Sequence, residues 1–149
     1  MKITRNLILL IVFSLFLAAC GLLKSELDTN LEKWKSQHPG HYRYDLQIGC
    51  FCAFMDKMPL SIEVENGQVV NISDATGAAP SAQEMEWYAS YTTIDKIFAY
   101  AQTATTEADQ VDIQYDPDFG YPTRISIDWI EQAIDDEMGL TVSNFTVIP

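Results

Sequence analysis

The stretch HYRYDLQIGC, residues 41–50, constrains the fold more than any other part of the chain, because its apolar and polar residues alternate without a break. One side of the alternation carries Tyr42, Tyr44, Leu46 and Ile48, and the other carries Arg43, Asp45 and Gln47. A repeat of two residues is the spacing of a strand whose successive side chains point to opposite faces. The chain is therefore expected to build a sheet with one buried face.

Other alternating segments extend this sheet. VDIQYD, TRISIDW and LTVSNFTVI each predict a strand, and the slip in the alternation between Val142 and Phe145 predicts a bulge near Ser143–Asn144. PLSIEVENGQVVNISD predicts a hairpin. A three-residue loop, Glu65–Gly67, is favoured there, because a two-residue loop would leave the apolar faces of the two strands mismatched; Val70 and Ile72 are then inward residues.

Apolar residues at helical spacing predict helices before each group of strands. Leu27, Leu31 and Trp34 form one stripe, which Pro39–Gly40 ends. A second stripe consists of Ile94, Ile97, Phe98 and Ala101. Ser25 and Asp28 have the spacing of a capping box, and so do Ser81 and Glu84, which predict a short additional helix.

The order of elements is helix, three strands, linker, helix and three strands. This order predicts a two-layer α+β fold, an antiparallel sheet with helices on one face, with two halves of similar plan. In layout only, it resembles the tandem modules of PepSY-type domains and of the β-lactamase inhibitor protein, and such a likeness carries no function. The predicted core contains Trp34, Leu46, Ile62, Ile97, Phe98 and Ile127.

The N-terminus has the three parts of a secretory signal peptide. Lys2 and Arg5 precede the apolar run Leu7–Leu17, which is too short to span a bilayer. The ending LAAC resembles a bacterial lipobox, in which Cys20 becomes the acylated first residue. We therefore expect a signal peptide at residues 1–19, an acylated (palmitate-type) tether at 20–26 and a single domain at 27–149.

Gly21, rather than an aspartate, follows this cysteine. By resemblance to Gram-negative lipoproteins, this favours a lipid anchor in the outer membrane, with the protein facing the periplasm of the cell envelope. Without Lys2 and Arg5, seven basic residues face 21 acidic ones, a formal charge of −14. Nucleic acid is an unsuitable partner for such a chain. In the simpler interpretation, the negative charge keeps the protein soluble. In the alternative, it binds a cation or a basic partner.

Cys50 and Cys52 are the only other cysteines. An oxidising compartment favours a disulfide between them. In a straight strand their Cα atoms would be about 6.6 Å apart, near the upper limit for such a bond, so the bond requires the chain to kink. The alternative is a soft-metal site in which Met55 and Met58, with His38 or His41, join the two thiolates. A catalytic thiol pair is a third possibility.

A group of acidic residues forms the second candidate site. It consists of Asp116, Asp118, Asp128, Asp135, Asp136 and Glu137. If the strands bring these carboxylates together, they suit calcium, although their spacing is not that of an EF-hand. The alternative is that Asp116–Gly120 forms a turn and that residues 135–137 form a solvated loop.

Several segments together resemble a bacterial family of exported proteins and lipoproteins known only as domain of unknown function 6174. They are Trp34, YRYDLQIGCFC, SIEVENGQV, TIDKIF, YDPDFGYPTRISID and the DDE of residues 135–137. The resemblance spans nearly all of residues 30–147 and implies no reaction, substrate or ligand.

The chain shows no nucleophile elbow, phosphate loop or dinucleotide fingerprint. The leading interpretation is therefore a non-enzymatic envelope lipoprotein without a cofactor that binds a protein or peptide. Aromatic residues gathered on the open sheet face would supply the docking surface. The alternative is a metal-handling lipoprotein built on Cys50 and Cys52.

Overall fold

A computed structural model describes residues 24–149. The expected signal peptide and Cys20 lie outside this range. Within it, no helix is both long enough and apolar enough to cross a membrane.

The described chain forms helices and strands in the predicted order. The helices are α2 (Glu26–Gln37), η1 (Met55–Lys57, a single 3₁₀ turn), α3 (Ala82–Tyr88) and α4 (Ile94–Glu107). The strands are β1 (His41–Gly49), β2 (Leu60–Glu65), β3 (Gln68–Ser73), β4 (Gln110–Tyr115), β5 (Pro122–Asp128) and β6 (Met138–Val147).

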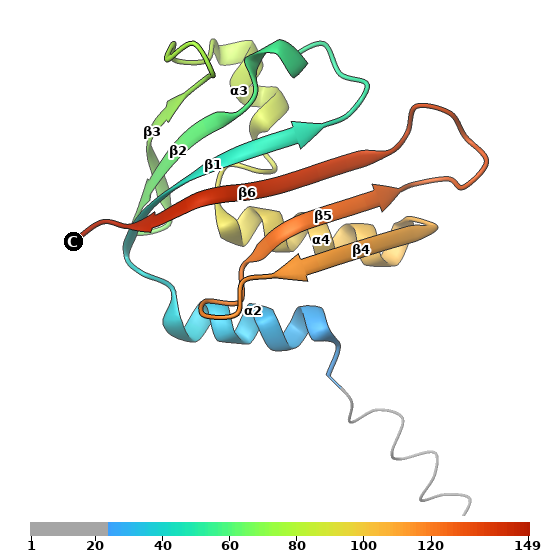
Figure 1. Ribbon diagram of the computed structural model, residues 1–149, viewed down its shortest axis with the longest axis horizontal. Coiled ribbons are helices and arrows are strands. Elements are labelled where there is room, and N and C mark those ends of the chain that lie inside the picture. The colour runs from blue at the N-terminus through green and yellow to red at the C-terminus, as the bar shows by residue number, and fades with distance from the viewer. Residues whose placement is uncertain (1–23) are drawn as a thin grey trace, which may run out of the picture.

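The six strands make one antiparallel sheet in the order β3-β2-β1-β6-β5-β4 (Figure 1). Each half of the chain supplies a meander of three strands. The first strand of one meander, β1, pairs with the last strand of the other, β6, along most of its length. The fold is therefore α+β, as predicted, and the two halves share one sheet.

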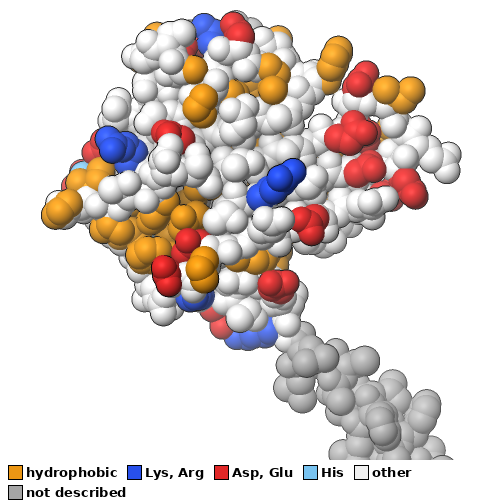
Figure 2. Space-filling view, in the orientation of Figure 1, with side chains coloured by type: hydrophobic (Ala, Val, Ile, Leu, Met, Phe, Trp, Pro, Cys, Tyr) orange, Lys and Arg blue, Asp and Glu red, His pale blue; other side chains and the backbone are white. Residues whose placement is uncertain are grey.

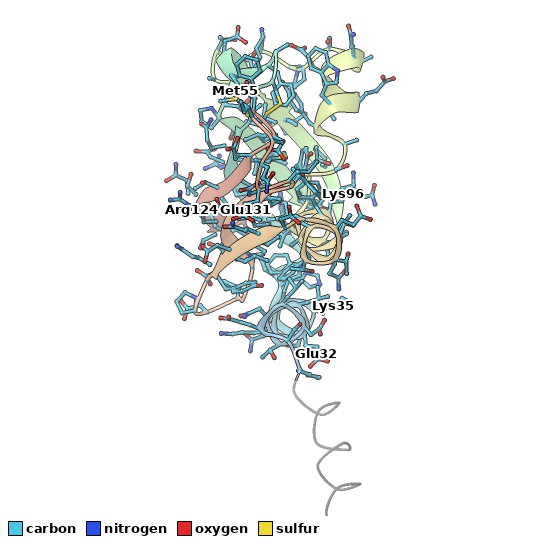
Figure 3. The ribbon with its side chains drawn as sticks, turned by 90° about the vertical axis from the view of Figure 1, so that its right-hand side faces the viewer. Glu32, Lys35, Met55, Lys96, Arg124 and Glu131 are labelled. Atoms are coloured by element: carbon cyan, nitrogen blue, oxygen red, sulfur yellow. A yellow bond between two sulfur atoms is a disulfide. The ribbon has the colours of Figure 1, made fainter. Side chains whose placement is uncertain are left out.

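The helices α3 and α4 lie behind the sheet in Figure 1, and α2 lies along its lower end. Seen from the side, the sheet and α4 form two layers, and Met55 lies at the opposite end of the molecule from Glu32 and Lys35 of α2 (Figure 3). All six predicted core residues are buried. The inner faces of β1 and β2 and the apolar stripe of α4 supply most of this core.

Helix ends follow the capping signals in the sequence. The Ser25 hydroxyl accepts the backbone N–H of Asp28 at the start of α2. Ser81 and Glu84 form a complete capping box at the start of α3, because each side chain accepts the other residue's backbone N–H.

The predicted hairpin loop is wrong. Asn66 and Gly67 form a two-residue turn with φ values of 51° and 76°, and Val64 pairs with Val69. The mismatch of apolar faces that this loop creates is corrected by a register shift, after which Ile62 pairs with Ile72. Val70 is the extra residue, and its side chain is 51% exposed instead of inward.

The predicted bulge in β6 is present. The partners of β1 shift between Arg43 and Asp45, and Asn144 has a φ of 52°. Its side-chain amide donates a hydrogen bond of 2.8 Å to Asp45. The bulge turns Phe145 onto the rings of Tyr42 and Tyr121.

An aromatic docking surface does not form on the open sheet face. Tyr42, Tyr44 and Tyr121 are buried under the helices, where Trp34 packs edge-on against two of them. The open face carries polar side chains instead, among them Arg43, Gln47, Arg124, Ser126 and Thr141. These three tyrosines and Trp34 thus belong to the core.

Candidate functional site

Two loops meet at one end of the sheet and enclose a groove. Residues 50–59 connect β1 to β2, and residues 129–137 connect β5 to β6 (Figure 1). The groove has a volume of about 380 Å³ and lies against the outer face of β1, β6 and β5, next to the two loops. We call it the loop-end groove.

Small residues form the floor of the loop-end groove. Gly49 of β1 pairs with Gly139 of β6, which in turn pairs with Ser126 of β5. Their neighbours Ile48, Leu140 and Ile125 are buried in the core, so the floor residues face outward. Three adjacent strands therefore present almost no side-chain volume at this point.

Neither glycine is required by the backbone. A Cβ atom added to Gly49 would lie 3.8 Å from its nearest neighbour, and one added to Gly139 would lie 3.9 Å from its nearest neighbour, both ordinary van der Waals distances. Neither residue has a positive φ. An alanine would fit at either position, so glycine is not required there, and the lack of side chains keeps the groove open.

One wall of the groove is the sulfur-containing loop. The structure joins Cys50 and Cys52 by a disulfide with a Cα–Cα distance of 5.2 Å. This separation is possible because β1 ends at Gly49 and the chain turns there. Phe51, between the two cysteines, is 84% exposed and borders both the groove and a neighbouring hollow of about 500 Å³ that also contacts Met55.

The opposite wall is acidic. Asp135 and Glu137 line it beside Met138, and no Lys or Arg contributes to the lining. Acidic and apolar side chains gather on this β5–β6 loop, at the right of Figure 2. Ile134, at 87%, is the most exposed of the large apolar side chains in the described chain.

The acidic loop is braced by two carboxylates. The backbone N–H of Ile130 donates to Asp136 at 2.7 Å, and that of Glu131 donates to Asp109 at 3.0 Å. Desolvation and then the charges of Asp136 and Glu137 raise the pKa of Asp128, with smaller contributions from Asp109 and Glu131. The four neighbouring carboxylates concentrate negative potential at this end of the sheet.

The six predicted acidic residues do not converge. Asp116 and Asp118 lie in the β4–β5 turn, where Asp116 accepts the N–H groups of Asp118 and Phe119. Asp128, Asp135, Asp136 and Glu137 lie at the other end of β5. The seven residues of β5 separate the two groups by roughly 20 Å of strand, so the turn interpretation holds for Asp116.

The predicted soft-metal set is not assembled either. The sulfurs of Cys50 and Cys52 are bonded to each other, and Met58 is buried in the core. His38 precedes β1 and His41 is its first residue, so the length of this strand separates both histidines from the cysteines that follow it. His41 contacts Glu63 at 2.7 Å. Within residues 24–149, no group of three or more His, Cys, Asp and Glu side chains is placed to hold a metal ion.

Sequence reasoning missed the groove floor and two acidic residues. Gly49 and Ser126 occupy outward positions of recognised alternations, but nothing local indicates that β1 lies beside β6. Asp109 approaches Asp128 because β4 pairs with β5, whereas Glu131 follows Asp128 by three residues, in the loop after β5. The missing information is the long-range strand order.

The comparisons with known proteins give one match. The model of a family of unknown function (DUF6174) matches residues 26–147, which include every strand and helix of the described fold. No curated protein and no solved structure matches the chain. The likeness to PepSY-type modules therefore remains one of layout.

Proposed function

We propose that this chain, which belongs to the family of unknown function DUF6174, is a non-enzymatic lipoprotein of the cell envelope whose loop-end groove binds a basic segment of another protein or peptide. The observation that carries the proposal is that the exposed Phe51 and the carboxylates of Asp135 and Glu137 line the same groove, over a floor of two glycines and a serine. Such a site offers one apolar contact and one ionic contact to the same ligand.

The apolar side favours burial by a partner. An exposed phenylalanine contributes roughly 2 kcal/mol when it is covered, and nothing in the described chain covers Phe51. The disulfide fixes the turn that presents it, which lowers the conformational entropy lost on binding. Rigid presentation of an aromatic residue is typical of residues that anchor interfaces.

The charge determines which partner fits. Asp135 and Glu137 face the groove without a basic residue in its lining, and the whole chain has a formal net charge of −12. A basic partner is attracted to this potential, whereas an acidic one is repelled. A partner segment in which an arginine or lysine lies next to an apolar residue would complement both the acidic wall and the Phe51 wall of the groove.

The anchor is inferred from the sequence. The LAAC ending at Cys20 supports acylation, and Ser25 and Glu26 begin the folded chain a few residues later. The proposed tether is therefore short, and the domain is held close to the membrane surface. Gly21 supports an outer-membrane position, with the groove in the periplasm.

A small peptide tests the groove directly. We propose to titrate the acylated protein, in neutral detergent, with acetyl-Arg-Leu-Arg-amide and to follow backbone amide signals by NMR. The signals of Gly49, Ser126 and Gly139 should shift, and Glu137→Lys should weaken binding about tenfold. Glu65→Lys, the same charge change at the end of β2, where Glu65 pairs with His41 far from the groove, should have no effect.

Two results would contradict the proposal. One is a set of shifts confined to residues outside the groove. The other is equal binding of acetyl-Glu-Leu-Glu-amide, because a groove selected for basic ligands must discriminate between the two peptides.

A further inference from the structure

A second surface, independent of the loop-end groove, lies along the outer edge of β4. Of the two edge strands, β3 contains the bulge at Val70, whereas β4 pairs regularly with β5 from Gln110 to Gln114. No strand among residues 24–149 pairs with the free side of β4. Its sequence, QVDIQY, contains neither lysine nor proline, the residues that commonly protect an edge.

The inner face of β4 is incompletely covered. Val111, Ile113 and Tyr115 point toward the helices but stay half-exposed, whereas the corresponding residues of β1 are buried. A groove of about 310 Å³ runs beside them, between β4, the start of α2 and the end of α4. A strand added to β4 would cover this apolar surface with every second side chain.

The rim of this edge groove is acidic. Glu26 and Asp112 line it, and no Lys or Arg does. Burial, followed by the nearby charges of Glu26 and Asp28, raises the pKa of Tyr115 to about 12. Asp28 therefore lies close enough to add to the negative potential at the far end of β4.

We propose that the edge of β4 binds a basic, extended peptide segment as a seventh strand of the sheet. Backbone hydrogen bonds to Gln110–Gln114 would supply affinity, and pockets for alternate side chains would supply selectivity. Apolar side chains of the segment contact Leu27, Val111 and Ile113, its basic side chains on the outer face lie beside Asp112, and Glu26 adds to the negative potential of the rim.

A second copy of the chain is a poorer occupant. Antiparallel pairing of two β4 strands would bring together two acidic rims, each with Asp112 near the centre of its strand. Like charges facing each other across strands are destabilising. A basic partner removes this repulsion and replaces it with attraction.

The probe for this site is a fluorescent six-residue peptide of alternating lysine and valine, matched to the length of β4. The acylated protein should bind it, and amide hydrogen exchange should slow in β4 but not in β3. The same peptide, N-methylated at alternate residues on the edge that faces β4, should bind at least about tenfold more weakly, because it cannot complete the hydrogen bonds.

Charge variants identify the site. Asp112→Lys should weaken binding about tenfold or more. Glu65→Lys, the same charge change in β2 and outside both grooves, should leave both the affinity and the β4 protection unchanged. Circular dichroism of the variants establishes that each retains the fold.

Three results would overturn the proposal. The first is equal binding of the N-methylated peptide, and the second is equal binding by Asp112→Lys. The third is a concentration-dependent dimer whose own β4 amides are protected, which would assign the edge to self-association.

Discussion

Gly49 of β1 and Gly139 of β6 are paired across the centre of the sheet, and neither is glycine for conformational or steric reasons. Glycine in a strand interior weakens the strand, because it packs no side chain and loses more entropy on folding. Two glycines opposite each other therefore cost stability at the junction of the two meanders. The open groove above these two residues explains why both positions carry glycine.

The core prediction concerns Phe98. Its ring is buried between α4 and the sheet, so Phe98→Ala should lower the free energy of unfolding by about 3–5 kcal/mol. Trp87→Ala is the control, because Trp87 is 41% exposed and stacks only on Phe54. Urea unfolding followed by circular dichroism measures both. Equal losses in the two variants would argue against the described position of α4.

The pH prediction concerns Asp74, whose side chain is buried. Its carboxylate accepts the Thr76 hydroxyl at 2.6 Å and the N–H groups of Thr76 and Ala78, and Lys57 lies 3.6 Å away. The Thr76 hydroxyl is the largest of several contacts that lower the pKa of Asp74. The charged form therefore stabilises the fold above the unfolded pKa of about 4, and this contribution is lost as pH falls through the folded pKa.

Asp74→Asn should accordingly lower the melting temperature at pH 7, and the difference from the unaltered protein should shrink below pH 4. Thermal unfolding at a series of pH values measures this difference. The exposed Asp56→Asn serves as the matched control. A difference that is constant from pH 3 to pH 7 would show that the Asp74 charge is not responsible.

The disulfide prediction concerns Cys50 and Cys52, between which there is only one residue. Closing so small a loop removes little entropy from the unfolded chain, so the double Ser variant should fold and lose less than about 2 kcal/mol. Protein isolated from the envelope should have no free thiol at these positions. Alkylation under denaturing conditions, with and without reductant, checks this. Two alkylated cysteines without reductant, on metal-free protein, would exclude the bond.

The anchoring prediction concerns Cys20. If acyl chains attach the protein to the membrane, Cys20→Ser should remain unprocessed or become soluble. Membrane fractionation and mass measurement of the N-terminus distinguish these outcomes from normal processing. Complete membrane retention with normal cleavage would rule out the lipobox interpretation.

The fold was largely predictable because its signals are local. The alternation in β1, the capping box of Ser81 and Glu84 and the stripe on α4 each lie within one element and survive in the structure. The prediction of the hairpin loop length was wrong for a physical reason. A bulge at Val70 allows a two-residue turn while the apolar faces farther along the strands still match. A loop length cannot be deduced from apolar register when a bulge can restore that register.

The candidate site was predictable only in part. Of the cysteines and the acidic residues 135–137 to which the sequence pointed, Cys50, Asp135 and Glu137 line one groove. Their juxtaposition depends on β1 pairing with β6, a contact between the two ends of the folded chain. The same topology separates Asp116 and Asp118 from the other acids, because they occupy opposite ends of β5.

The most direct test of the proposed function is photo-crosslinking in the intact cell envelope. Benzoylphenylalanine in place of Phe51 should give a light-dependent adduct with another protein, attached through a basic segment of that protein. The same group in place of Val70, on the far edge strand, should give none. Gly139→Leu, whose Cβ would lie at ordinary van der Waals distances and whose side chain would occupy the groove, should abolish the adduct, while Glu65→Lys should preserve it. An adduct at Phe51 that persists in Gly139→Leu, or no adduct at all, would contradict the assignment of the loop-end groove as the binding site.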